Sequence, residues 1–176
     1  MRQRLFILLG SAAVALAAAT AALAGNLTAT VTVSGAAGMS MNLPADPSLT
    51  ETLDGTDQVV TWSAILGIVD ARGTGAGWNL TLATTTFADG SGHTLAPGAV
   101  TAVGAVCQGG SSCTGATNSV TYPITISGTA VKFFNAAANT GLGKVNVTPS
   151  VDVAIPGNAY AGTYTSTVTL AAVSGP

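Results

Sequence analysis

Apolar and polar residues alternate along most of the chain from residue 27 onward. This period of two places every second side chain on one face of a β-strand. The first such run has Leu27, Ala29, Val31 and Val33 separated by threonines. The same pattern predicts further strands over residues 58–69, 78–83, 120–126, 129–134, 144–155 and 164–172. Since no stretch in this part has the 3.6-residue period of a helix, we expect an all-β domain: a two-sheet antiparallel β-sandwich with Greek-key-like connections.

One residue interrupts this pattern inside its longest run. Pro149 lies in the apolar series between residues 145 and 155. Proline has no N–H to donate to a strand ladder and is confined to edge strands and bulges. The sequence therefore predicts that residues 144–155 form an edge strand or contain a bulge.

The N-terminus has the organisation of a secretory signal peptide. Arg2 and Arg4 precede a long apolar run, which ends in Ala-Leu-Ala at residues 22–24. We expect cleavage after Ala24, which leaves a single domain over residues 25–176 with no further membrane span. The alternative is an uncleaved anchor, because the run approaches the ~20 residues that cross a bilayer.

The chain is poor in charge. Charged residues make up 7% of it, and after removal of the leader three basic residues stand against seven acidic ones. Nucleic-acid binding needs a clustered basic surface, so it is excluded, and capture by anionic wall polymers or lipids is disfavoured. The Thr-rich surface also offers little charge repulsion against self-association.

Candidate chemistry is sparse. Cys107 and Cys113 enclose a Gly/Ser-rich loop, and in a secreted chain they are expected to form a disulfide. The single His93, the single Glu51 and the absence of a nucleophile elbow leave no catalytic constellation. We therefore expect a non-enzymatic protein with no metal site and no cofactor.

The segment over residues 69–82, V-D-A-R-G-T-G-A-G-W-N-L-T-L, resembles the proximal motif of the WxL domain family. Residues 59–64 and 155–169 are similar to other strands of that family. Its second W-x-L falls on residues 170–172, which read Leu-Ala-Ala here. The resemblance implies a secreted domain on the surface of Gram-positive bacteria, bound to peptidoglycan or to a membrane-anchored partner protein of the cell surface.

The motif contributes the candidate binding residues Asp70, Arg72, Trp78, Asn79 and Leu80. A structural interpretation stands beside the binding one. Asp70 and Arg72 would brace a tight turn, and Trp78 shares the apolar face of its strand and would belong to the core. The glycines at positions 73, 75 and 77 would adopt positive φ or approach another backbone closely.

Three functions remain open at this point. The first is non-covalent wall association, and the second is a self-assembling subunit that donates the strand over residues 26–33 to a neighbour. The third is a carbohydrate-binding module, which would need a row of exposed aromatic residues. Tyr160 and Tyr164 are candidates for it, although the alternation predicts burial of Tyr164. We expect His93 to be a solvent-facing loop residue.

Overall fold

The computed structural model describes residues 30–36 and 38–176. Residues 30–32 belong to one compact unit of the chain and Val33–Pro176 to a second. Every strand lies in the second unit, and no helix occurs in the described residues. The predicted signal peptide (1–24) lies outside the described residues, as do residues 27–29 of the predicted first strand.

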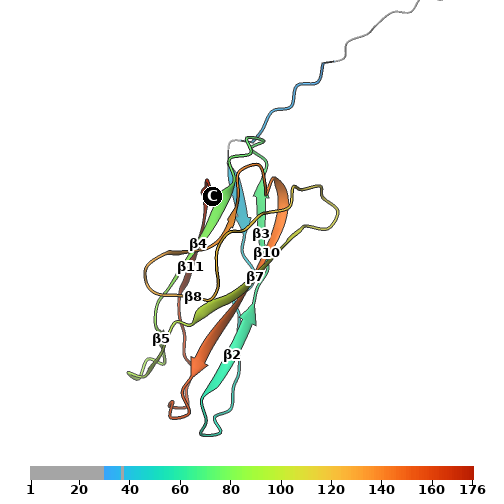
Figure 1. The fold of residues 1–176 in the computed structure, drawn as a ribbon. Helices are drawn as coiled ribbons and strands as arrows, with labels where there is room; N and C mark the ends of the chain where they lie inside the picture. The colour runs from blue at the N-terminus through green and yellow to red at the C-terminus, as the bar shows by residue number, and fades with distance from the viewer. Residues whose placement is uncertain (1–29, 37) are drawn as a thin grey trace, which may run out of the picture. The chain divides into compact units, whose positions relative to one another are not determined.

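The larger sheet is built around one long strand. β10 (Gly143–Ile155) pairs antiparallel with β7 (Ala99–Cys107) along one side. Along its other side lie β3 (Leu66–Asp70) and then β2 (Gln58–Ser63), end to end (Figure 1). β1 (Met39–Asn42) extends the sheet beyond β3, and β8 (Ile124–Thr125) extends it beyond β7.

A second sheet and a short hairpin complete the domain. β4 (Trp78–Thr84) lies between β11 (Val168–Ser174) and β9 (Val131–Ala136). The hairpin consists of β5 (Phe87–Ala88) and β6 (Thr94–Leu95).

The core lies between the two sheets. β3 and β10 supply Leu66, Ile68, Val145 and Val147, while β4 and β9 supply Trp78, Leu80, Leu82, Phe133 and Phe134. All of these side chains are buried, and Trp78 is fully buried against Phe134, with ring centroids 5.6 Å apart. The predicted antiparallel two-sheet sandwich is confirmed.

The prediction of an edge strand at Pro149 is wrong, and the bulge beside it has its extra residue, Thr101, in the neighbouring strand β7 and not in residues 144–155. β10 is central in its sheet, and its register against β7 shifts between Ser150 and Val151. Pro149 itself falls between the end of the β3 pairing at Val147 and the start of the β2 pairing at Ser150. A residue without an N–H costs little where the ladder on one side is already interrupted.

Other predicted strands differ from the observed ones. The run 58–69 divides into β2 and β3, and only residues 124–125 of the run 120–126 form a strand. The predicted first strand is not formed over residues 30–33: no strand is present there, and Val31 and Val33 are 83% and 89% exposed. An isolated strand has no partner for its backbone groups, so alternation alone does not produce one.

Candidate functional site

The connection from β3 to β4 contains the glycine-rich segment of the motif. Gly73, Gly75 and Gly77 have φ values of 69°, 66° and 71°, as the sequence predicted. At Gly77 a Cβ would also lie 2.5 Å from the carbonyl oxygen of Ala136. A side chain at position 77 would therefore meet both backbone strain and a direct overlap.

The buried Asp70 carboxylate and the half-buried Arg72 guanidinium form an ion pair at the start of this connection. Asp70 Oδ1 accepts hydrogen bonds from Arg72 Nε at 2.9 Å and from the Arg72 backbone N–H at 3.2 Å, and Oδ2 accepts from Nη2 at 2.9 Å. Hydrogen bonds from Arg72 hold the pKa of the Asp70 carboxyl below its usual value, although burial acts in the opposite direction. The carboxylate also raises the pKa of Arg72, so the pair is ionised at neutral pH.

Arg72 also ties the glycine-rich connection to the last strand. Its Nη2 donates to the Gly77 carbonyl at 2.9 Å, and its Nη1 donates to the hydroxyl of Ser174 in β11. Asn79 Nδ2 adds a hydrogen bond to the Gly175 carbonyl at 2.8 Å. The guanidinium thus joins three segments: the end of β3, the start of β4 and the end of β11.

Trp78 is held from its polar edge as well as by packing. Its indole N–H donates to the Gly141 carbonyl at 3.0 Å. Gly141 has φ of 74°, and a Cβ there would lie 2.6 Å from the Trp78 Nε1 atom. The indole is thereby enclosed, with no exposed surface.

These five candidate residues are largely removed from solvent. Trp78 and Leu80 are fully buried, Asp70 is 1% exposed, and Arg72 and Asn79 are half-buried. In the structure these residues lie close together and hold the glycine-rich connection between β3 and β4 against the end of β11. A direct contact with a ligand stays a prediction for them.

Where the motif expects a second Trp, the chain has an inward-facing Leu. Leu170 pairs with Leu82, and Ala172 pairs with Leu80, in the β11–β4 ladder. Both side chains are half-buried and pack against the core. The position thus contributes to the same apolar layer with a smaller side chain.

The two cysteines form a disulfide, as predicted. It joins Cys107, at the end of β7, to Cys113, with their Cα atoms 5.6 Å apart. Cys113 also forms an isolated bridge with Gly143 at the start of β10. The closed loop is therefore fixed to the end of the larger sheet.

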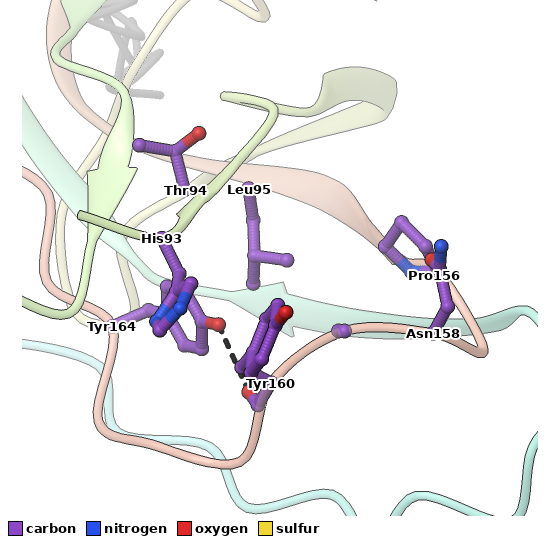
Figure 2. Close-up of a pocket in the computed structure, with 8 residues that line it drawn as sticks. His93, Thr94, Leu95, Pro156, Asn158, Tyr160 and Tyr164 are labelled. Atoms are coloured by element: carbon purple, nitrogen blue, oxygen red, sulfur yellow. Dashed lines mark hydrogen bonds between the residues drawn. The ribbon is translucent and has the colours of Figure 1, made fainter. Parts of the chain in front are cut away.

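A second cluster lies where the β5–β6 hairpin meets the segment that follows β10. The His93 ring stacks on Tyr160, with ring centroids 3.9 Å apart and planes inclined by 15°. His93 Nδ1 lies 2.6 Å from Asp89 Oδ2, and this contact is the main reason why the pKa of Asp89 is lowered. Figure 2 shows Tyr160 between His93 and the turn that carries Pro156 and Asn158.

The prediction for His93 therefore needs correction. Its side chain is 36% exposed, but it is bound by Asp89 and covered on one face by Tyr160. Sequence reasoning missed this cluster because its halves lie more than 60 residues apart. The prediction that Tyr164 is withdrawn from solvent is consistent with its half-buried state, and its hydroxyl donates to the Tyr160 carbonyl at 2.9 Å.

Within the described part of the chain, no group of three metal-ligating side chains comes together. The same residues contain no helix long and apolar enough to cross a membrane.

Comparison with known proteins identifies the family. A family model described as WxL domain, surface cell wall-binding, matches residues 24–173. No curated protein and no solved structure matches the chain significantly. The matched region contains the glycine-rich connection, all the strands of both sheets except the last residue of β11, and the His93–Tyr160 cluster. Since the match covers most of the sequence, the chain belongs to the WxL domain family of cell-surface, cell wall-binding domains.

Proposed function

We propose that the chain is exported, cleaved after Ala24, and held on the wall by non-covalent, uncharged contacts with peptidoglycan. The family match carries the assignment to the wall. The family description names a binding role and no reaction, which supports a binding domain rather than an enzyme.

The few basic residues support a neutral mode of recognition. Arg72 is engaged with Asp70, which leaves Lys132 and Lys144 as the other basic side chains of the described residues. The described residues contain six acidic residues besides Asp70: Asp46, Glu51, Asp54, Asp57, Asp89 and Asp152. Two lysines that are outnumbered by acidic residues do not attract a polyanion, so hydrogen bonding and apolar contact remain as the means of binding.

The five motif residues would serve this function from beneath the surface. We propose that Asp70, Arg72, Trp78, Asn79 and Leu80 fix the glycine-rich connection and the last strand in one geometry. A binding surface that is rigid before it meets its ligand loses less conformational entropy on binding.

The experiment is sedimentation of the exported, processed chain with isolated Gram-positive walls. Parallel tubes hold walls chemically stripped of their anionic polymers and no walls at all. We expect sedimentation with both wall preparations and none without walls. Sedimentation only with unstripped walls would refute the neutral mode, and a soluble chain in every tube would point to a membrane-anchored partner protein.

One observation favours self-assembly as a second candidate function. Val31 and Val33 are almost fully exposed in a segment with alternating apolar residues and no strand partner. Such a segment could add to a free sheet edge of another copy. Sedimentation without walls, abolished by joint Val31→Thr and Val33→Thr substitutions, would establish this candidate in place of wall binding.

A further inference from the structure

A small hollow lies beside the exposed face of Tyr160. Its volume is about 210 Å³, and its lining includes His93, Leu95, Pro156, Asn158, Tyr160 and Tyr164. Pockets for drug-sized ligands are about 300–1,000 Å³. The hollow therefore has the size for one ring with its substituents rather than for an extended ligand.

The two segments that form the hollow are joined by backbone hydrogen bonds. Ala88 and Thr165 exchange two of them, at 3.0 and 2.9 Å. On the other side, the N–H of Gly157 donates to Asp57 Oδ1 at 2.9 Å, and a Cβ at Gly157 would lie 2.6 Å from the Gly55 carbonyl oxygen. These contacts fix the hairpin and the turn after β10 in place before any ligand arrives.

Tyr160 is the one aromatic side chain among the described residues that is largely exposed, at 64%. An exposed tyrosine normally samples several rotamers and would lose that freedom on binding. Here His93 covers one face of the ring, Asp89 holds His93, and Tyr164 holds the Tyr160 backbone. The remaining aromatic face is thereby presented as a fixed platform.

The other lining residues suit a particular kind of ring. The C–H face of a pyranose carries slight positive charge and stacks on the electron-rich face of an aromatic ring. Leu95 and Pro156 offer an apolar wall for a methyl group, and the Asn158 amide offers both a donor and an acceptor. A sugar with an acetamido substituent has all three features: a C–H face, a methyl group and an amide.

We propose that this hollow binds one N-acetylated aminosugar ring of the wall glycan, stacked on Tyr160 with its acetamido group against Leu95, Pro156 and Asn158. The proposal rests on the proposed function, because it names the part of peptidoglycan that the domain recognises. It also accounts for recognition without charge, since every contact is a stacking, apolar or hydrogen-bonding one.

The test is an NMR titration of the ¹⁵N-labelled exported chain with a β-1,4-linked tetramer of N-acetylglucosamine. The matched probe is the glucose tetramer with the same linkage, which carries a hydroxyl in place of each acetamido group. We expect the first probe to shift amide signals of residues 89–95 and 156–164 and the second to bind about tenfold more weakly or not at all. Equal binding of the two probes, or shifts confined to other residues, would overturn the proposal.

Three variants separate stacking from a general loss of structure. Tyr160→Ala should weaken binding of the N-acetylglucosamine tetramer by about tenfold or more, equivalent to ~1.4 kcal/mol. Tyr160→Phe keeps the aromatic face, so its Kd for the tetramer should stay within about threefold of that of the unmodified chain, a difference of under ~1 kcal/mol. Val106→Ala changes another exposed apolar residue, 65% exposed in β7, and should leave binding unchanged. Comparable binding by the Ala and Phe variants at position 160 would overturn the stacking geometry.

Wall sedimentation of the same variants distinguishes this proposal from the proposed function. If the unmodified chain and Tyr160→Ala sediment equally with walls and neither responds to the tetramer, the hollow is not the glycan site and wall binding stands. If the unmodified chain does not sediment with walls, wall binding fails, and the titration still decides whether the hollow takes the sugar.

Discussion

Replacing Arg72 by Met would test whether the ion pair with Asp70 holds the motif together. Met removes the guanidinium but retains much of the side-chain volume, so the main change is the loss of charge and hydrogen bonds. The Asp70 carboxylate is 1% exposed and would remain in the interior without its partner. Breaking a buried pair in this way costs about 3–5 kcal/mol of the free energy of unfolding.

The contacts of Arg72 give a second route to this magnitude. The side chain donates two hydrogen bonds to the carboxylate, one to the Gly77 carbonyl and one to Ser174. Hydrogen bonds that involve charged groups contribute about 1.5–3 kcal/mol each, and they are not additive within one network. Two such hydrogen bonds together already reach the range of about 3–5 kcal/mol given above. This is a large share of the free energy of unfolding of a typical domain, which is about 5–15 kcal/mol.

Urea unfolding at pH 7, followed by tryptophan fluorescence, measures this loss. Trp78 is fully buried and Trp62 packs against the core, so unfolding changes the surroundings of both. The double variant with Asp70→Asn should recover about 1–3 kcal/mol of the loss, because it removes the stranded charge. Lys132→Met, at an exposed position, should stay within about 0.5 kcal/mol of the unmodified chain. A loss below about 1 kcal/mol for Arg72→Met would refute the structural role of the pair.

Three further predictions concern the same domain. Because the pKa of Asp70 is lowered in the folded state, its ion pair with Arg72 should stabilise the fold above about pH 4, and this stabilisation should be lost as the pH falls further. The difference in the free energy of unfolding between the unmodified chain and Arg72→Met should therefore become smaller in acid, as measured by unfolding titrations at decreasing pH. Gly77→Ala should lower the free energy of unfolding by at least about 2 kcal/mol, from positive φ and overlap together, whereas Gly73→Ala should cost only about 1 kcal/mol, because nothing lies near its Cβ; equal losses in urea unfolding would contradict this reasoning. Joint Cys107→Ser and Cys113→Ser substitutions should cost about 2–3 kcal/mol through the freed loop, and an unchanged melting temperature would count against a stabilising disulfide.

The sequence was informative where the alternation was regular. β4 and β10 were predicted nearly to their ends, since each has large apolar residues at every second position. β7 was missed. Thr101 is the extra residue at the bulge, so the inward-facing positions change phase between Val100 and Val103. A pattern search with a fixed period of two cannot follow such a shift.

The candidate sites show the same division between local and long-range information. The glycine-rich connection was predicted because it is local in sequence and its φ values follow from glycine chemistry. The role of Asp70 and Arg72 as braces of the turn was predicted, but the hydrogen bond from Arg72 to Ser174 could not be predicted. The His93–Tyr160 stack likewise depends on how two distant turns pack, which no spacing rule contains.

The binding of the exported chain to purified peptidoglycan, measured at low and high salt, tests the central claim most directly. Neutral recognition predicts saturable binding whose Kd changes by less than about twofold between about 50 and 500 mM NaCl, because screening acts on charges and leaves stacking and apolar contacts intact. A steep loss of affinity with salt would show that charge holds the domain to the wall. If the chain binds at neither salt concentration, the account is contradicted altogether.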